Sequence, residues 1–217
     1  MFCLILKDIK VLLGRTGTFV QSILLGLVLV FLFSLARPVG DVFSETYAST
    51  VFWIASIFSM ILIFNSLYLL EQENDMQSAL LLSPLTAEKI WLAKSISGFV
   101  ALLLLQIVLF ISTLVFLDQK QINFSFYFLL FFILIDVGLV LIGSLLGALS
   151  YGHEIKESFL SLVIFPLTVP VLLAGIKLGG CVWGDMIDIS GWFKIVLAFD
   201  CMYLGIGYIL FPFVFKT

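Results

Sequence analysis

Two aspartates inside long apolar stretches are the side chains of this sequence best placed to do chemistry. Asp136 and Asp200 each lie near the middle of an otherwise uncharged stretch. A charge at the centre of a bilayer costs about 2.5–3.5 kcal/mol on insertion scales, so each carboxyl should face protein or water, or be protonated. Two interpretations stay open: the acids relay protons or contact a substrate, or each only pairs locally.

The other reactive residue types do not form a site in the sequence. His153 is the single histidine, and Cys3, Cys181 and Cys201 show no CxxC spacing, so neither a zinc site nor paired haem ligands are indicated. The phosphate-binding GxxxxGK[ST] motif is absent, as are the hydrolase motifs GxSxG and HExxH. We therefore expect a chain that is not an enzyme and that binds no metal or cofactor of its own.

The segment 71–83, which separates the second and third apolar stretches, is strongly polar at its start. Its acids come first, where they favour the positive amino-terminal end of a helix, and an apolar run follows. Pro84 then ends the helix because its ring disfavours the helical conformation at Ser83, and Thr86 can cap the next helix. The candidate contact residues for a partner are Glu71, Glu73, Asp75, Met76, Leu80 and Leu81. The pattern predicts a short helix that another protein can grip, with a solvated loop as the alternative.

Residues 2–14 form a second amphipathic pattern at the start of the chain. At helical spacing one stripe is apolar, consisting of Phe2, Ile5, Leu6, Ile9, Leu12 and Leu13. Lys7, Lys10 and Gly14 lie opposite this stripe. Such a helix is expected in the membrane interface, either as a lipid anchor or as a docking element for a partner.

The apolar stretches that position these residues indicate a membrane protein. Of the 217 residues, 62% are hydrophobic and 12% charged, and the mean hydropathy is +1.24. So few charges cannot cover the surface of a soluble protein of this length, so the solvent must be mostly lipid. The net charge is −3 without a basic block, which argues against binding to nucleic acid.

Six apolar stretches are long enough to cross a bilayer, which takes about 20 residues. They lie at 16–36, 46–70, 94–117, 124–150, 158–177 and 193–215. Lysine and arginine are more frequent on the side of the termini than on the other side, which predicts that both termini are cytoplasmic. A five-span arrangement would require the last, glycine-containing stretch to be re-entrant.

Small and kinking residues mark two of the spans. Gly143 and Gly147 form a small-xxx-small pattern that lets helices approach closely. Pro166 and Pro170 lie on one face of the fifth span and each removes a backbone hydrogen bond, so this helix should kink.

Several of these segments together resemble the CcmB family, the membrane permease (haem exporter protein B) of the cytochrome c maturation system. They are the amphipathic start, the polar loop followed by Leu-Leu-Leu-Ser-Pro-Leu, Leu-Ala-Lys at 92–94, and the stretch 161–175. Its Pro-Leu-x-x-Pro-Val-Leu block is the most specific element. The chain departs from the family at 76–78, which lack the usual glycine, and at 154–157, where Arg-Gly-Gly is common.

The resemblance implies an all-α membrane protein with one ABC-2-like permease domain over 1–217, an interfacial helix at 2–14 and a cytoplasmic coupling helix at 71–83. It further implies a bacterial inner-membrane complex with the ATPase CcmA, with CcmC and with the small protein CcmD. There ATP hydrolysis releases the haem-loaded chaperone CcmE, or exports haem, so haem is handled by the complex. A homodimer within the complex and a mitochondrial inner-membrane homologue are also compatible with it.

Two other functions stay open on the residues alone. The chain could be a proton-driven secondary transporter that uses Asp136 and Asp200, although the internal repeat typical of many such transporters is not detectable. It could also be a scaffold that holds partners in the membrane without transporting anything.

Overall fold

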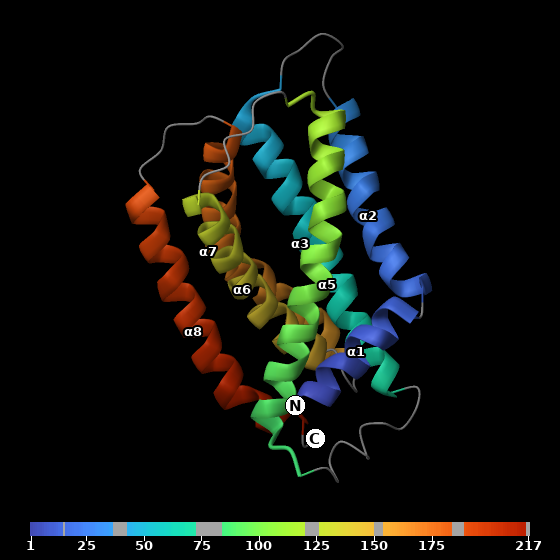
Figure 1. The fold of residues 1–217 in the computed structure, drawn as a ribbon. Coiled ribbons are helices and arrows are strands. Elements are labelled where there is room, and N and C mark those ends of the chain that lie inside the picture. Colours follow the sequence, from blue (N-terminus) through green and yellow to red (C-terminus); the bar gives the residue numbers. More distant parts are fainter. Residues whose placement is uncertain are drawn as a thin grey trace.

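The computed structural model describes residues 1–14, 16–36, 43–72, 84–119, 126–149, 154–183 and 189–215. Within these ranges the regular elements are all helices, as the sequence predicts. The helices are α1 (Phe2–Gly14), α2 (Thr16–Leu35), α3 (Glu45–Gln72), α5 (Ala87–Phe116), α6 (Phe126–Leu149), α7 (Glu154–Trp183) and α8 (Ile189–Phe215) (Figure 1).

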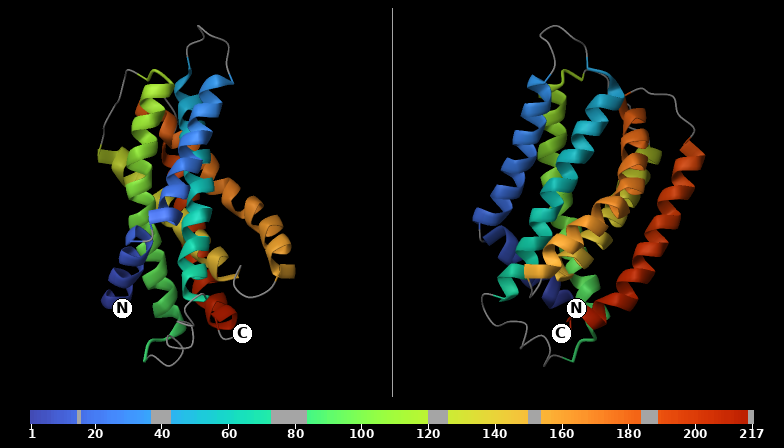
Figure 2. Two further views of the ribbon diagram at one scale, coloured as in Figure 1. Left: turned by 90° about the vertical axis from the view of Figure 1, so that its right-hand side faces the viewer. Right: turned by 180° about the vertical axis from the view of Figure 1, so that it is seen from behind.

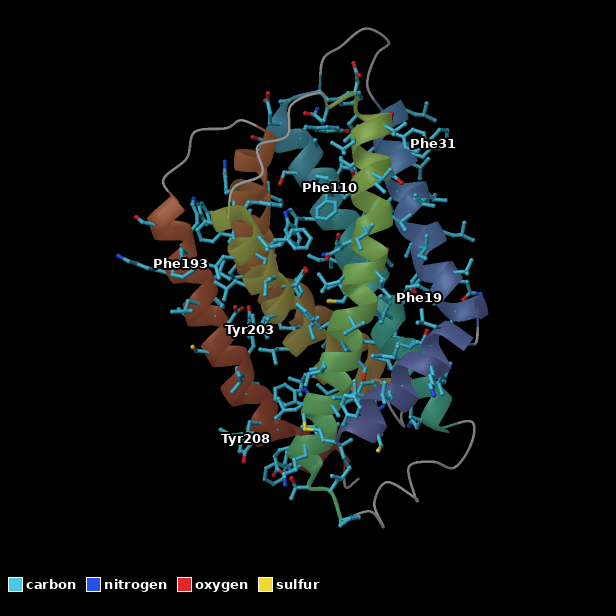
Figure 3. All side chains as sticks on the ribbon, in the orientation of Figure 1. Phe19, Phe31, Phe110, Phe193, Tyr203 and Tyr208 are labelled. Atoms are coloured by element: carbon cyan, nitrogen blue, oxygen red, sulfur yellow. The ribbon has the colours of Figure 1, made fainter. Side chains whose placement is uncertain are left out.

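The six long helices run side by side and alternate in direction, while the shorter α1 lies against one end of the bundle (Figures 1 and 2). α3 is central and contacts α2, α5, α6 and α7. In the most apolar window of α3, 67% of the residues are buried within the chain, whereas in that of α2 only 17% are. α2 is therefore a peripheral helix, and Figure 3 shows Phe31 at the outer edge of the bundle, half-exposed with one edge of its ring against Phe116 of α5.

In the described part of the chain, five helices are long and apolar enough to cross a membrane: α2, α3, α5, α6 and α8. The predicted sixth span is not confirmed, because the described apolar part of α7 is the shorter stretch Pro166–Gly180. The re-entrant alternative for the last stretch is wrong, since α8 is a continuous helix of 27 residues. α7 contains Pro166 and Pro170, and Figure 2 shows that this helix changes direction along its length, as the two prolines predict.

Glycines in α5 and α6 make room for aromatic rings of α3. A Cβ on Gly143 would lie 2.5 Å from Phe64 Cδ2, and one on Gly147 would lie 2.5 Å from Tyr68 Cδ2. Gly98 of α5 faces the other edge of the Phe64 ring in the same way. The small residues thus allow the close helix approach expected of this pattern, with Phe64 wedged between α5 and α6.

The face of α1 that contacts the bundle differs from the predicted stripe. Leu4, Asp8 and Leu12 are buried, whereas Phe2 is 72% and Leu6 42% exposed. A row at every fourth residue thus turns inward and includes an acid, while Phe2 and Leu6 of the apolar stripe stay exposed. The place of that stripe in the membrane interface or against a partner stays a prediction. Hydrophobic periodicity does not predict this face, because it counts Asp8 as polar and takes no account of its charged partner Lys94 in α5.

Candidate functional site

The structure describes the helices on either side of the polar segment between α3 and α5. α3 extends to Gln72 and so includes Glu71, whose side chain is not described; Glu73, Asp75, Met76, Leu80 and Leu81 lie outside the described residues. α5 begins at Ala87 with Thr86 at the N-cap position, but the Thr86 side chain makes no capping hydrogen bond. Its carbonyl oxygen instead accepts from the backbone of Lys89 and Ile90. The end of α3, the start of α5, α1 and the end of α8 all lie at one end of the bundle (Figure 1).

A buried lysine in the first turns of α5 connects three of these elements. Lys94 is 0% exposed, and its Nζ lies 3.8 Å from Oδ2 of Asp8 in α1, which is 3% exposed. The same Nζ donates a 3.5 Å hydrogen bond to the carbonyl oxygen of Leu67 in α3 and lies 4.7 Å from the centre of the Tyr68 ring. We refer to Asp8, Leu67, Tyr68 and Lys94 as the Lys94 cluster. It holds α1, α3 and α5 together where the polar segment begins and ends.

Two further contacts extend this arrangement to α6 and α8. The Tyr68 hydroxyl lies 3.1 Å from Ser144 Oγ of α6, both buried. Trp91, one turn before Lys94, is fully buried and packs on Gly207 of α8, where a Cβ would overlap the indole ring. The Trp91 and Phe211 ring centres are 6.4 Å apart. The start of α5 is thus in contact with α1, α3 and α8.

The first intramembrane acid, Asp136, has a partner on α5. Gln106 Nε2 donates a 2.8 Å hydrogen bond to Asp136 Oδ1, and both side chains are buried. Phe110 and Phe132 lie four residues from this pair on the same helices, and both contact Phe52 of α3.

One turn along α3 from Phe52, Ser56 is therefore expected at the level of the Gln106–Asp136 pair. Ser56 Oγ, Gln106 Oε1 and Asp136 Oδ2 have no hydrogen-bond partner in the described part of the chain. The Gln106–Asp136 pair thus forms a polar contact inside the bundle, between α5 and α6.

The second acid, Asp200 of α8, faces a different set of neighbours. Its carboxyl lies against Gly138 of α6, at a point where a Cβ would overlap it, and that space also adjoins Val171 of α7. Neither carboxyl oxygen has a hydrogen-bond partner among the described residues. One turn along α8, Tyr203 faces the bundle (Figure 3) and its hydroxyl donates to the carbonyl oxygen of Leu167, next to Pro166 of α7.

The two acids therefore do not form one site. Asp136 faces α5, whereas Asp200 faces Gly138 and α7. No group of three or more histidine, cysteine, aspartate or glutamate side chains that could hold a metal ion occurs in the described ranges. Among the described residues, the Lys94 cluster and Trp91 connect α1, α3, α5 and α8, close to the end of α3 and the start of α5.

Comparison with known proteins adds the family. The sequence model of the CcmB protein family matches residues 1–216, almost the whole chain. The chain belongs to the CcmB family. A search of curated proteins finds no match to it. Membership in the CcmB family makes this chain a multi-pass membrane protein with the role of a haem-exporter ABC permease in cytochrome c maturation. CcmB proteins are transport subunits rather than enzymes.

Sequence reasoning missed two residues that the CcmB fold uses. In the sequence, Lys94 counts only toward the charge bias of one side and the resemblance at 92–94, although a lysine in an apolar window already indicates a paired or snorkelling charge. Gln106 is the one amide side chain of α5, and an amide in a spanning helix often marks a contact between helices. Neither pairing could be derived, because Asp8 and Asp136 are far from these residues in sequence.

Proposed function

We propose that this chain is the permease subunit of a bacterial inner-membrane ABC transporter, with a CcmA-type ATPase bound to a coupling helix at 71–83. ATP hydrolysis by that partner moves the helix bundle, and the movement releases haem-loaded CcmE from a CcmC–CcmD assembly or exports haem. The acids Glu71, Glu73 and Asp75 and the apolar side chains of Met76, Leu80 and Leu81 form the contact surface. Two copies of the chain pair with two ATPases.

The observation that best supports this proposal is the packing of the helix ends on either side of the polar segment. α3 leads into it and α5 leads out of it. Close to these ends, Lys94 contacts α1 and α3, and Trp91 contacts α8. Because buried contacts connect the neighbouring turns, a force on the segment is transmitted to several helices together.

The proposal includes six crossings with both termini in the cytoplasm. α7 has 30 residues. Because a helix rises about 1.5 Å per residue, the length of α7 exceeds the roughly 30 Å of the hydrocarbon core. The six long helices alternate in direction, so α1 and the end of α8 lie on the same side (Figure 1). The lysine and arginine bias assigns that side to the cytoplasm.

Co-purification tests the proposal. The tagged chain is expressed with its ATPase partner and purified in mild detergent, and the Glu73→Lys/Asp75→Lys variant is compared with Glu45→Lys. Glu45 begins α3 at the opposite end of the bundle, so the control adds the same kind of charge away from the polar segment. We expect the double variant to lose most of the bound ATPase and of cytochrome c assembly, and the control to retain both. If no ATPase co-purifies with the unaltered chain, the proposal is wrong.

The two alternatives give different results. A secondary transporter would act without any ATPase, and the separate surroundings of Asp136 and Asp200 do not support a shared relay. A scaffold would bind the ATPase without changing its turnover. Stimulation of ATP hydrolysis by the unaltered chain, and its loss in the double variant, would exclude the scaffold.

A further inference from the structure

Lys94 is a charged side chain buried where lipid or protein would normally exclude a charge. Its side chain is 0% exposed, although it lies in the first turns of α5, close to the end of the bundle. A lysine at such a place can usually extend to water along its flexible stem. Here the side chain stays inside, so its charge must be stabilised by protein groups.

Those groups come from two other helices. Asp8 of α1 supplies the opposite charge at 3.8 Å, within ion-pair range but beyond hydrogen-bond distance. Leu67, near the carboxyl end of α3, supplies a carbonyl oxygen at 3.5 Å, and such carbonyls carry partial negative charge. The Tyr68 ring lies 4.7 Å away, at a distance typical of a cation–π contact.

The arrangement matters most for α1, which packs chiefly on α5. Ser97 Oγ lies 3.5 Å from the carbonyl oxygen of Ile5, one turn from the Asp8–Lys94 pair, while the nearer acceptor for its one proton is the Ala93 carbonyl oxygen of α5 at 2.9 Å. Asp8 also has a partly exposed partner. Lys7 Nζ lies 3.1 Å from Asp8 Oδ1, and the Lys7 side chain is 34% exposed. A partly exposed pair within one helix contributes little to stability, and Lys7 belongs to α1 itself, so only Lys94 makes Asp8 a link between α1 and α5.

We propose that Lys94 is a positioning residue that fixes α1 and the end of α3 to the start of α5, so that α1 moves as one unit with the two helices that flank the polar segment. α1 is therefore part of the element that receives the movement of the ATPase, in addition to contacting the membrane surface. The second statement rests on the proposed function; the first, the fixation of α1 by Lys94, does not.

Disulfide cross-linking tests the fixation without any ATPase. In a chain whose native cysteines are replaced by serine, Ile5→Cys and Ser97→Cys are introduced and membranes are oxidised with copper phenanthroline. We expect efficient intramolecular cross-linking, a several-fold lower rate with Lys94→Met, and an unchanged rate with Lys10→Gln, a control at an exposed lysine of α1. Asp8→Leu combined with Lys94→Met should restore the rate, because both polar groups are then removed together. Equal rates for Lys94→Met and the unaltered chain would overturn the fixation.

A second measurement tests the transmission of movement. The Lys94→Met chain is compared with the Lys10→Gln control for abundance in the membrane, ATPase co-purification, ATP turnover and cytochrome c assembly. We expect Lys94→Met to bind the ATPase and support ATP turnover while cytochrome c assembly falls at least several-fold, and the double variant with Asp8→Leu to recover assembly in part. Full assembly with Lys94→Met would overturn this role. Failure of the unaltered chain to bind any ATPase would instead contradict the proposed function and leave the cross-linking result intact.

Discussion

Gln106 Nε2 donates a 2.8 Å hydrogen bond to Asp136 Oδ1 across the interface between α5 and α6. The pair gives the intramembrane acid a neutral protein partner, inside the bundle and away from lipid. The acid therefore has a structural reason to be present that does not require it to relay protons. Two predictions follow from this bond, one for stability and one for activity.

The first prediction concerns the strength of the bond. A double-mutant cycle of Gln106→Leu and Asp136→Leu should give a coupling energy near 0.6 kcal/mol and no more than about 1.7 kcal/mol, the range measured for hydrogen bonds between helices in a bilayer protein. The loss of stability in the double variant should be smaller than the sum of the losses in the two single variants, because each single variant leaves the other polar group unpaired. Unfolding of the purified chain in detergent measures these differences, and a coupling energy of zero would contradict the contact.

The second prediction concerns the role of the acid in transport. Asp136→Asn keeps an oxygen that can accept from Gln106, so cytochrome c assembly should stay close to that of the unaltered chain. Asp136→Leu, which removes the acceptor, should lower the amount of folded chain. Quantification of haem-stained cytochromes against the abundance of the chain separates the two effects. Complete loss of assembly in a stable Asp136→Asn chain would favour a proton relay.

A third prediction tests the wedge formed by Phe64. Gly98→Ala places a methyl group against the Phe64 ring, and overpacking of this kind typically costs about 1–3 kcal/mol. Gly205→Ala is the matched control, because nothing lies within 4 Å of that position in α8. Phe64→Leu should partly restore the stability of the Gly98→Ala chain. Thermal unfolding in detergent distinguishes the variants, and equal midpoints for the two alanine variants would refute the wedge.

The spans themselves were visible in the sequence because lipid demands long apolar helices. α2, α3, α5, α6 and α8 fall in the long apolar stretches for that reason. α7 differs because its described apolar part is short and contains Pro166 and Pro170. The amphipathic α1 was expected as well, but its docking face was not. Hydrophobic periodicity finds an apolar stripe, whereas Asp8 turns toward the bundle because Lys94 of α5 supplies the opposite charge.

The candidate site was only partly predictable for the same reason. The acids and the proline stop of 71–83 are local signals and point to the segment directly. Lys94 and Trp91 act through partners in α1, α3 and α8, and such long-range pairs leave no local pattern. Asp200 was recognised as an unusual residue, but its place beside Gly138 depends on the packing of α6 against α8.

A fourth prediction tests whether α7 crosses the membrane. Single cysteines replace Pro84, Asp118 and Ser190 in a chain without native cysteines, since all three positions are exposed. If α7 crosses, an impermeant maleimide should label positions 118 and 190 in intact spheroplasts and position 84 only after permeabilisation. Labelling of position 190 only after permeabilisation would place it on the side of position 84 and contradict six spans.

The central claim, that the segment between α3 and α5 receives the ATPase, is tested most directly by photo-cross-linking. A benzophenone amino acid is placed at Leu81 in the segment and at Leu35, which is 64% exposed at the opposite end of the bundle. The account predicts an ultraviolet-dependent adduct with the ATPase from position 81 that changes in yield with ATP, and none from position 35. Absence of the adduct at position 81, with the ATPase still bound to the complex, would contradict it.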